Sequence, residues 1–275
     1  MEFNDILKIL LPVLVCFDAA MICGIILVVS SSLFAVKEDE KFAKIRDCLP
    51  GANCGACGFS GCDGYAKALS SGECDITNLC VPGGDGAAKD IAAILGVEAE
   101  DVVEKVAYVA CNGNCDATKR KFDYKGEKSC HIANMSYNGD KLCTFACLGY
   151  GDCVKVCPQN AIKVENGVAK VDPTSCIGCG MCTRACPNGI IKMVEDTARV
   201  AVLCSNHEKG AVTRKACTNG CIGCGKCVKS CPNGAIKVEH NLAVIDYEKC
   251  IGCGECAKAC PIGCIIEENF ICGAH

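Results

Sequence analysis

Tryptophan is absent from the chain, and aromatic side chains as a whole are scarce. The 275 residues include 8 phenylalanines and 6 tyrosines, and the hydrophobic fraction of 51% counts 31 cysteines among its members. A chain with so few large apolar side chains builds only a thin core. Disulfides or bound metal are therefore expected to supply the stability that the core lacks.

Long runs of basic residues are also lacking. Lysine and arginine together number 28 against 32 aspartates and glutamates, which leaves a net charge of −4. Nucleic-acid-binding proteins usually carry a basic stripe or patch, so no nucleic-acid partner is predicted. The length is enough for one to three small domains.

One long hydrophobic run lies near the amino terminus. Residues 9–36 contain a single charged residue, Asp18. About 20 apolar residues span a bilayer as a helix, so a transmembrane anchor is predicted over residues 1–36. A signal peptide is the alternative, but the start MEFND is acidic and no convincing A-x-A site follows. At that depth Asp18 is a candidate intramembrane functional residue, unless it lies near the outer interface or faces a partner's polar group.

The basic residues around this run predict its orientation. Lys8 precedes the run, and four basic residues follow it at Lys37, Lys41, Lys44 and Arg46. The positive-inside rule then places the carboxy-terminal bulk in the cytoplasm, as part of a single-pass protein of the plasma or inner membrane. Thiols stay reduced in that compartment, so dense cysteines there indicate metal binding rather than disulfides.

From about residue 140 the chain repeats itself with a period of 74 residues, as Cys153 and Cys227 show. Each copy contains a cysteine-rich loop, two short strands joined by a turn, and a second cysteine-rich loop. The hairpins are expected at residues 161–172 and 235–246, with turns at Asn-Gly and His-Asn. Two tandem units are predicted, preceded by a cysteine-containing connecting segment. The expected ranges are 107–140 for the segment and 141–200 and 201–275 for the units.

The cysteine spacing within the repeats is that of bacterial ferredoxins. Three cysteines at C-x2-C-x2-C bind one [4Fe-4S] cluster, and the cysteine of the following x3-C-P reaches the neighbouring cluster. Zinc is the alternative, although four-cysteine zinc sites use two pairs rather than triplets. Three ligand sets follow: Cys157, Cys176, Cys179 and Cys182; Cys221, Cys224, Cys227 and Cys260; Cys231, Cys250, Cys253 and Cys256.

A fourth set departs from the pattern because Tyr150 occupies the position of its middle cysteine. The stretch CTFACLGYGDC offers Cys143 instead, four residues before Cys147. The fourth cluster is therefore expected in a loop of altered geometry. Its predicted ligands are Cys143, Cys147, Cys153 and Cys186.

Five further cysteines lack the standard spacing: Cys111, Cys115, Cys130, Cys204 and Cys217. Two of them lie in similar stretches, VACNG at 109–113 and VLCSN at 202–206. A sixth cluster drawn from these five is our hypothesis, and reduced structural thiols are the alternative.

A separate cysteine- and glycine-rich stretch lies between the hydrophobic run and the repeats. Its first three cysteines have the spacing C-x2-C-x4-C: Cys54, Cys57 and Cys62. Cys80 is the candidate fourth ligand, with Cys74 as the alternative. A helix beginning at Cys62 would direct its amide groups at an anionic cluster. This indicates a small helical [4Fe-4S] module over residues 37–106, and five or six [4Fe-4S] clusters in the whole chain.

The expected fold is thus α+β, with a transmembrane helix, the small helical module and two tandem bacterial-ferredoxin-like 2[4Fe-4S] units. With the stretch LPGANCGACGFSGC…CVPGG, this organisation resembles the B subunit of Rnf complexes along essentially the whole chain. The resemblance implies a membrane-bound ferredoxin:NAD⁺ oxidoreductase that couples electron flow to Na⁺ or H⁺ export. This subunit would take electrons from soluble ferredoxin, and other membrane and cytoplasmic subunits would hold flavins and the nicotinamide site. The chain fits that division because it has no G-x-G-x-x-G fingerprint, and no catalytic residue is predicted on it.

Ferredoxins are usually acidic, so a docking site for one should be basic. The stretch TKRKFDYKGEK at 118–128 makes Lys119, Arg120 and Lys121 the candidates, with a solvated loop as the alternative. A membrane-tethered polyferredoxin without ion pumping is the alternative function. A cysteine-rich structural protein that binds zinc is the third.

Overall fold

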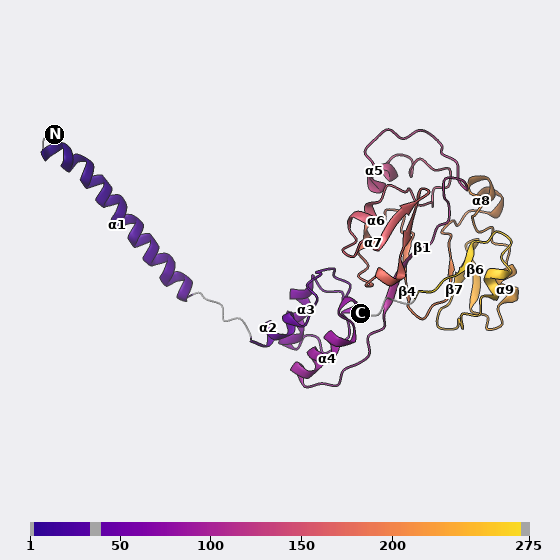
Figure 1. The fold of residues 1–275 in the computed structure, drawn as a ribbon, viewed down its shortest axis with the longest axis horizontal. Helices are drawn as coiled ribbons and strands as arrows, with labels where there is room; N and C mark the ends of the chain where they lie inside the picture. The colour runs from indigo at the N-terminus through magenta and orange to yellow at the C-terminus, as the bar shows by residue number, and fades with distance from the viewer. Residues whose placement is uncertain (1–2, 34–39, 271–275) are drawn as a thin grey trace. The chain divides into compact units, whose positions relative to one another are not determined.

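The structure, a computed structural model, describes residues 3–33 and 40–270, with side chains in the first helix described at residues 14 and 17–31. The chain divides into two compact parts, Met1–Ala43 and Lys44–His275. The first contains helix α1 (Phe3–Leu33; Figure 1). Within the described parts of the chain, no helix has the length and apolar character that a membrane crossing requires. The anchor predicted over residues 1–36 is not confirmed and stays a prediction, and its first two and last three residues lie outside the described residues.

Short helices precede the repeats: α2 (Glu40–Asp47), α3 (Cys62–Ser71), the 3₁₀ turn η1 (Val81–Gly83) and α4 (Gly84–Leu95). Helix α3 ends where Gly72 adopts a left-handed conformation, which a residue without Cβ adopts at little cost. Tyr65 and Leu69 of α3 and Ile91 of α4 are fully buried. This helical module therefore has a small apolar core of its own.

The first ferredoxin-like unit contains two antiparallel strand pairs, one of which is labelled in Figure 1. Strand β1 (Lys105–Val109) pairs with β4 (Ile191–Glu195), and β2 (Ile162–Glu165) pairs with β3 (Val168–Val171). The connections contain α5 (Cys130–Met135), α6 (Asp152–Lys155), η2 (Pro173–Ser175) and α7 (Met181–Ala185). The expected start of the connecting segment at residue 107 falls inside β1.

The second ferredoxin-like unit repeats this arrangement. Strand β5 (Val200–Val202) pairs with β8 (Ile265–Glu267), and β6 (Ile236–Glu239) pairs with β7 (Leu242–Ile245). Its helices are α8 (Gly210–Ala216), α9 (Lys226–Ser230) and α10 (Glu255–Lys258). In each unit the opening strand pairs with the closing one, so β5 corresponds to β1 and β8 to β4.

Both predicted hairpins are confirmed. Asn166 and Gly167 join β2 to β3, and His240 and Asn241 join β6 to β7, all four with positive φ. Two consecutive residues with positive φ are what a two-residue type I′ turn requires, and its twist matches that of the flanking strands.

The core of each ferredoxin-like unit mixes thiols with small aliphatic side chains. In the first unit Cys147, Cys153 and Cys182 are buried with Ile162 and Ile190. Cysteines take similar places in the second unit: Cys204, Cys221, Cys227 and Cys256. The interior is therefore arranged around sulfur rather than around aromatic rings.

Candidate metal centres

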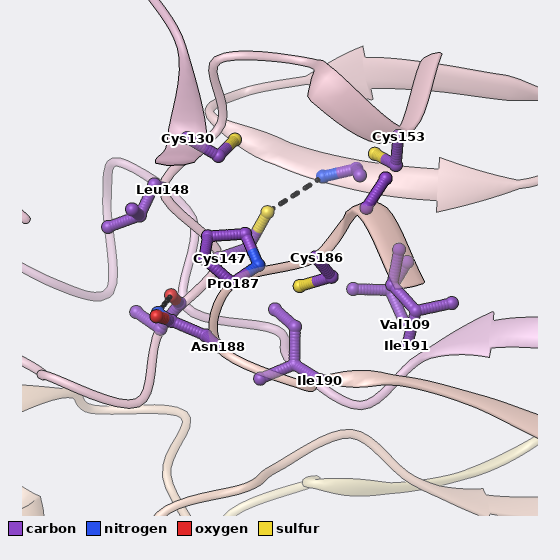
Figure 2. A pocket seen from close by; sticks show the side chains of 13 residues that line it. Val109, Cys130, Cys147, Leu148, Cys153, Cys186, Pro187, Asn188, Ile190 and Ile191 are labelled. Atoms are coloured by element: carbon purple, nitrogen blue, oxygen red, sulfur yellow. Dashed lines mark hydrogen bonds between the residues drawn. The ribbon is translucent and has the colours of Figure 1, made fainter. Parts of the chain in front are cut away.

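Four thiols from separate segments converge on one cavity in the first ferredoxin-like unit, as Figure 2 shows: Cys130, Cys147, Cys153 and Cys186. Val109, Leu148 and Ile190 complete an apolar lining. The backbone N–H of Ala169 donates to Cys147 Sγ at 3.4 Å. An apolar cavity that combines four sulfurs with an N–H donor suits an anionic sulfur-ligated group.

Cys130 takes the place in this first cavity that the sequence analysis gave to Cys143. The hydroxyl of Ser129, the N-cap of α5, donates to Asp152 Oδ2 at 2.8 Å. The backbone N–H of His131 donates to the same oxygen at 3.0 Å. Because Asp152 begins α6, these bonds hold the start of α5 beside the thiol that follows Asp152. The structure thus does not bring Cys143 to the set in which it was expected.

A second cavity, between the two ferredoxin-like units, also collects four thiols: Cys111, Cys143, Cys204 and Cys217. Cys111 lies two residues after β1 and Cys204 two residues after β5. The resemblance of VACNG to VLCSN therefore reflects equivalent ends of equivalent strands. Of the five cysteines proposed for a sixth cluster, three meet here, whereas Cys130 lines the first cavity and Cys115 is exposed.

Backbone and side-chain N–H groups point at the sulfurs of this second set. Cys111 Sγ accepts from the N–H of Gly113 and from that of Cys147, both at 3.3 Å. Asn206 Nδ2 donates to Cys143 Sγ at 3.5 Å. Such donors stabilise negative charge on sulfur, as a thiolate ligand requires.

The sets with standard ferredoxin spacing are also brought together. One cavity is lined by Cys157, Cys176, Cys179 and Cys182, and another by Cys221, Cys224, Cys227 and Cys260. The remaining standard set consists of Cys231, Cys250, Cys253 and Cys256. Cys256 interacts electrostatically with Cys250 and Cys231, and Cys253 lies in the same loop as Cys250 and Cys256. The repeat extends to hydrogen bonds, because Ala161 N–H donates to Cys157 Sγ and Ala235 N–H to Cys231 Sγ, each at 3.3 Å.

The helical module gathers Cys54, Cys57, Cys62 and Cys80. Burial, together with the nearby thiols of Cys62, Cys57 and Cys54, raises the pKa of the Cys80 thiol to about 11. The alternative ligand, Cys74, instead directs its thiol toward the carbonyl oxygen of Ile76 at 3.8 Å. Asn53 Oδ1 accepts a 2.9 Å bond from Cys62 N–H and fixes the start of α3.

The thiols of these sets are chemically suited to a metal cofactor. Burial raises the pKa of Cys153 and of Cys182 to about 12, and that of Cys204 to about 11. Such thiols keep their protons until a metal replaces them. All-sulfur donor sets select iron–sulfur clusters or zinc. In the part of the chain that the structure describes, no three side chains are placed to hold a single metal ion.

Two ferredoxin-like units with paired four-cysteine sets define an iron–sulfur protein of the polyferredoxin class. Comparison with protein families agrees. Two 4Fe-4S dicluster domain models match the repeats, one at residues 146–190 and 220–264 and the other at 175–236. A third model, for a putative Fe-S cluster, matches residues 49–82, the range that holds the set of the helical module.

Similar proteins identify the family. The B subunit of the Na⁺-translocating ferredoxin:NAD⁺ oxidoreductase complex of Acetobacterium woodii is 43% identical over 88% of this chain and 72% of its own length. The B subunit of the proton-translocating complex of Clostridium ljungdahlii is 43% identical over 82% of this chain and 80% of its own. The B subunit of an ion-translocating oxidoreductase complex of Methanosarcina acetivorans is 41% identical over 82% of this chain and 86% of its own length. The chain belongs to the family of Rnf complex B subunits, and its 4Fe-4S domains fit an electron-transfer role.

Proposed function

We propose that this chain accepts electrons from reduced ferredoxin and passes them singly, through six [4Fe-4S] clusters, to other subunits of an ion-translocating Rnf complex. The observation that carries the proposal is that each four-cysteine set lies against the next. When bound, the clusters supply one-electron redox chemistry, and the protein holds them in a fixed series within an apolar interior.

The series begins at the helical module. Cys54 of its set interacts electrostatically with Cys179, and the side chain of Arg184 on α7 donates to the carbonyl oxygen of Cys54. Within the first ferredoxin-like unit, Cys182 and Cys153 of its two sets are buried in the same apolar cluster, and Cys182 acts electrostatically on Cys153. The first three sets are thus consecutive neighbours.

The series continues into the second ferredoxin-like unit through the cavity between the two. The N–H of Cys147 donates to Cys111 Sγ, and the N–H of Cys221 donates to Cys204 Sγ, each at 3.3 Å. The set of Cys111 and Cys204 therefore connects the two ferredoxin-like units. Helix α9 joins the last two sets, because it carries Cys227 and ends immediately before Cys231.

Metal content tests this proposal on the full chain purified without oxygen. About 24 iron atoms and 24 sulfides per chain are expected, four of each for every cluster. About 20 of each would mean that one of the six sets holds no cluster, and the proposed series of six would be wrong. Zinc without sulfide would overturn the electron-transfer function altogether.

Membrane attachment through the hydrophobic run at residues 9–36, with the carboxy-terminal bulk in the cytoplasm, is part of the proposal. It rests on the hydrophobic run and on the basic residues that follow it. Asp18, whose side chain is exposed in α1, is the candidate for a role within the membrane. One similar protein belongs to a complex named as Na⁺-translocating and another to a complex named as proton-translocating, so the proposal does not specify which ion is translocated.

The ferredoxin docking site is proposed on the basic segment before α5. Lys119 and Lys121 are exposed there. Met135 at the end of α5 and Tyr137 just after it are also exposed, at 78% and 85%. This segment leads into α5, which contributes Cys130 to the first cavity, so an acidic partner bound here would lie next to a cluster. Arg120 differs from its two neighbours because it pairs with the buried Asp140 at 3.1 Å.

Charge reversal at Lys119 and Lys121 tests the docking site. Changing both to Glu, and leaving Arg120 to balance Asp140, should slow ferredoxin oxidation about tenfold at low ionic strength and flatten its salt dependence. Stopped-flow oxidation of reduced ferredoxin measures the rate. Lys226→Glu with Lys229→Glu on α9 is the matched control, since both residues are exposed and the change in net charge is the same. Equal rates in the two variants would refute this location.

A further inference from the structure

A buried lysine lies between two of the cysteine sets. Lys141 is 3% exposed, and its Nζ donates to the carbonyl oxygens of Gly113 at 2.8 Å and Gly167 at 2.7 Å. Lys141 forms no ion pair with any carboxylate that the structure describes. The adjacent Asp140 is already paired with Arg120.

A buried ammonium group is costly unless a negative charge balances it. Two carbonyl dipoles supply hydrogen bonds but no net charge. The stability of this arrangement therefore requires an anionic partner that protein carboxylates do not provide. Four thiolates around a [4Fe-4S] core give such a site a net negative charge.

Lys141 lies close to two cysteine sets. Its charge acts on Cys111 and Cys217 of the cavity between the ferredoxin-like units, and on Cys147 of the first cavity. Both carbonyl acceptors belong to segments that also donate to sulfur. Gly113 donates through its N–H to Cys111 Sγ, and Gly167 lies two residues before Ala169, whose N–H reaches Cys147 Sγ.

We propose that Lys141 is a positioning residue whose fixed positive charge, shared between these two neighbouring clusters, raises the reduction potentials of both. The inference rests on the proposed function, since it needs clusters at both sets. One-electron reduction makes each site more negative, and a nearby cation in a low-dielectric interior stabilises the reduced form. Lys141 would thereby favour electron occupancy where the path crosses from one ferredoxin-like unit to the other.

The test is Lys141→Met in the full chain, which removes the charge and keeps the length of the side chain. Redox titration monitored by electron paramagnetic resonance should show two clusters shifted to lower potential. At least a tenfold fall in the equilibrium constant for reduction is expected, which is about 59 mV for one electron. Lys170→Met is the matched control, because Lys170 is next to Ala169 but its side chain is 66% exposed and pairs with Glu165. Its titration should match the wild type, since solvent screens that charge.

Iron content separates the outcomes. Full loading with unchanged potentials in Lys141→Met would overturn the inference and leave the proposed function standing. A wild-type chain without iron and sulfide would instead refute the proposed function. If the Met variant loads fewer clusters, Lys141→Gln and Lys141→Arg are compared with it. If the Gln variant also loses iron and the Arg variant keeps it, a positive charge at this position is required, as we propose. If the Met, Gln and Arg variants all lose iron, the role of Lys141 is purely structural and the inference is wrong.

Discussion

Replacing Cys143 and Cys186 together by alanine is expected to remove about eight iron atoms and eight sulfides per chain, which corresponds to two clusters. The structure places the two thiols in different cavities, with Cys186 beside Cys130 and Cys143 beside Cys217. The grouping expected from the sequence places both in one set, and a double variant would then lose only about four of each. Iron and sulfide analysis of the double variant distinguishes the two groupings.

The single variants provide the internal control for this result. Cys143→Ala and Cys186→Ala should each lose about four iron atoms, and the double variant should show the sum of the two losses. Cys115→Ala should lose none, because Cys115 is exposed and lines neither cavity. A double variant that loses no more iron than either single variant would contradict the structural grouping.

Removing the clusters should unfold the two ferredoxin-like units. Their strands are three to five residues long and form only two-stranded sheets. Such pairs are marginal by themselves, and the buried residues around them are largely cysteines and small aliphatic side chains. Deprotonated thiols held at one point by metal therefore contribute a large part of the folding free energy.

Hydrogen exchange before and after oxidative iron chelation measures this effect. Amide protection in β1 to β8 should fall to that of an unstructured chain, and reconstitution with iron and sulfide should restore it. Amides of α3 and α4 should keep partial protection, because Tyr65, Leu69 and Ile91 give that module an apolar core. Native protection of the strands in the iron-free protein would contradict the dependence of the fold on its clusters.

Much of the site could be predicted because ferredoxin ligand loops are local. Three ligands of each standard set lie within seven residues, and their spacing alone identifies them. The hairpins were equally predictable, since Asn166 with Gly167, and His240 with Asn241, suit a two-residue turn. These features depend on short-range geometry, which sequence patterns record directly.

The exchange of Cys130 and Cys143 could not be predicted in the same way. The position of Cys130 depends on the hydrogen bond between Ser129 and Asp152, 23 residues apart, and on the one from His131 N–H to the same carboxylate. No spacing rule encodes such a tertiary contact. The burial of Lys141 escapes prediction for a related reason, because a lysine in the polar stretch SYNGDK is expected to be solvated, and only the folded chain shows where it lies.

The cavity between the ferredoxin-like units also has a consequence for biosynthesis. Its four cysteines extend from Cys111 to Cys217, and two of them come from each unit. A chain emerging from the ribosome can complete the set around Cys130 and Cys186 well before residue 217 is made. The cavity between the ferredoxin-like units can form only after both units have been synthesised, and bringing its cysteines together carries the entropic cost of closing a long loop. We therefore expect its cluster to be inserted after the set around Cys130 and Cys186 is filled, so that early maturation intermediates would hold that cluster while the cavity between the ferredoxin-like units is still empty.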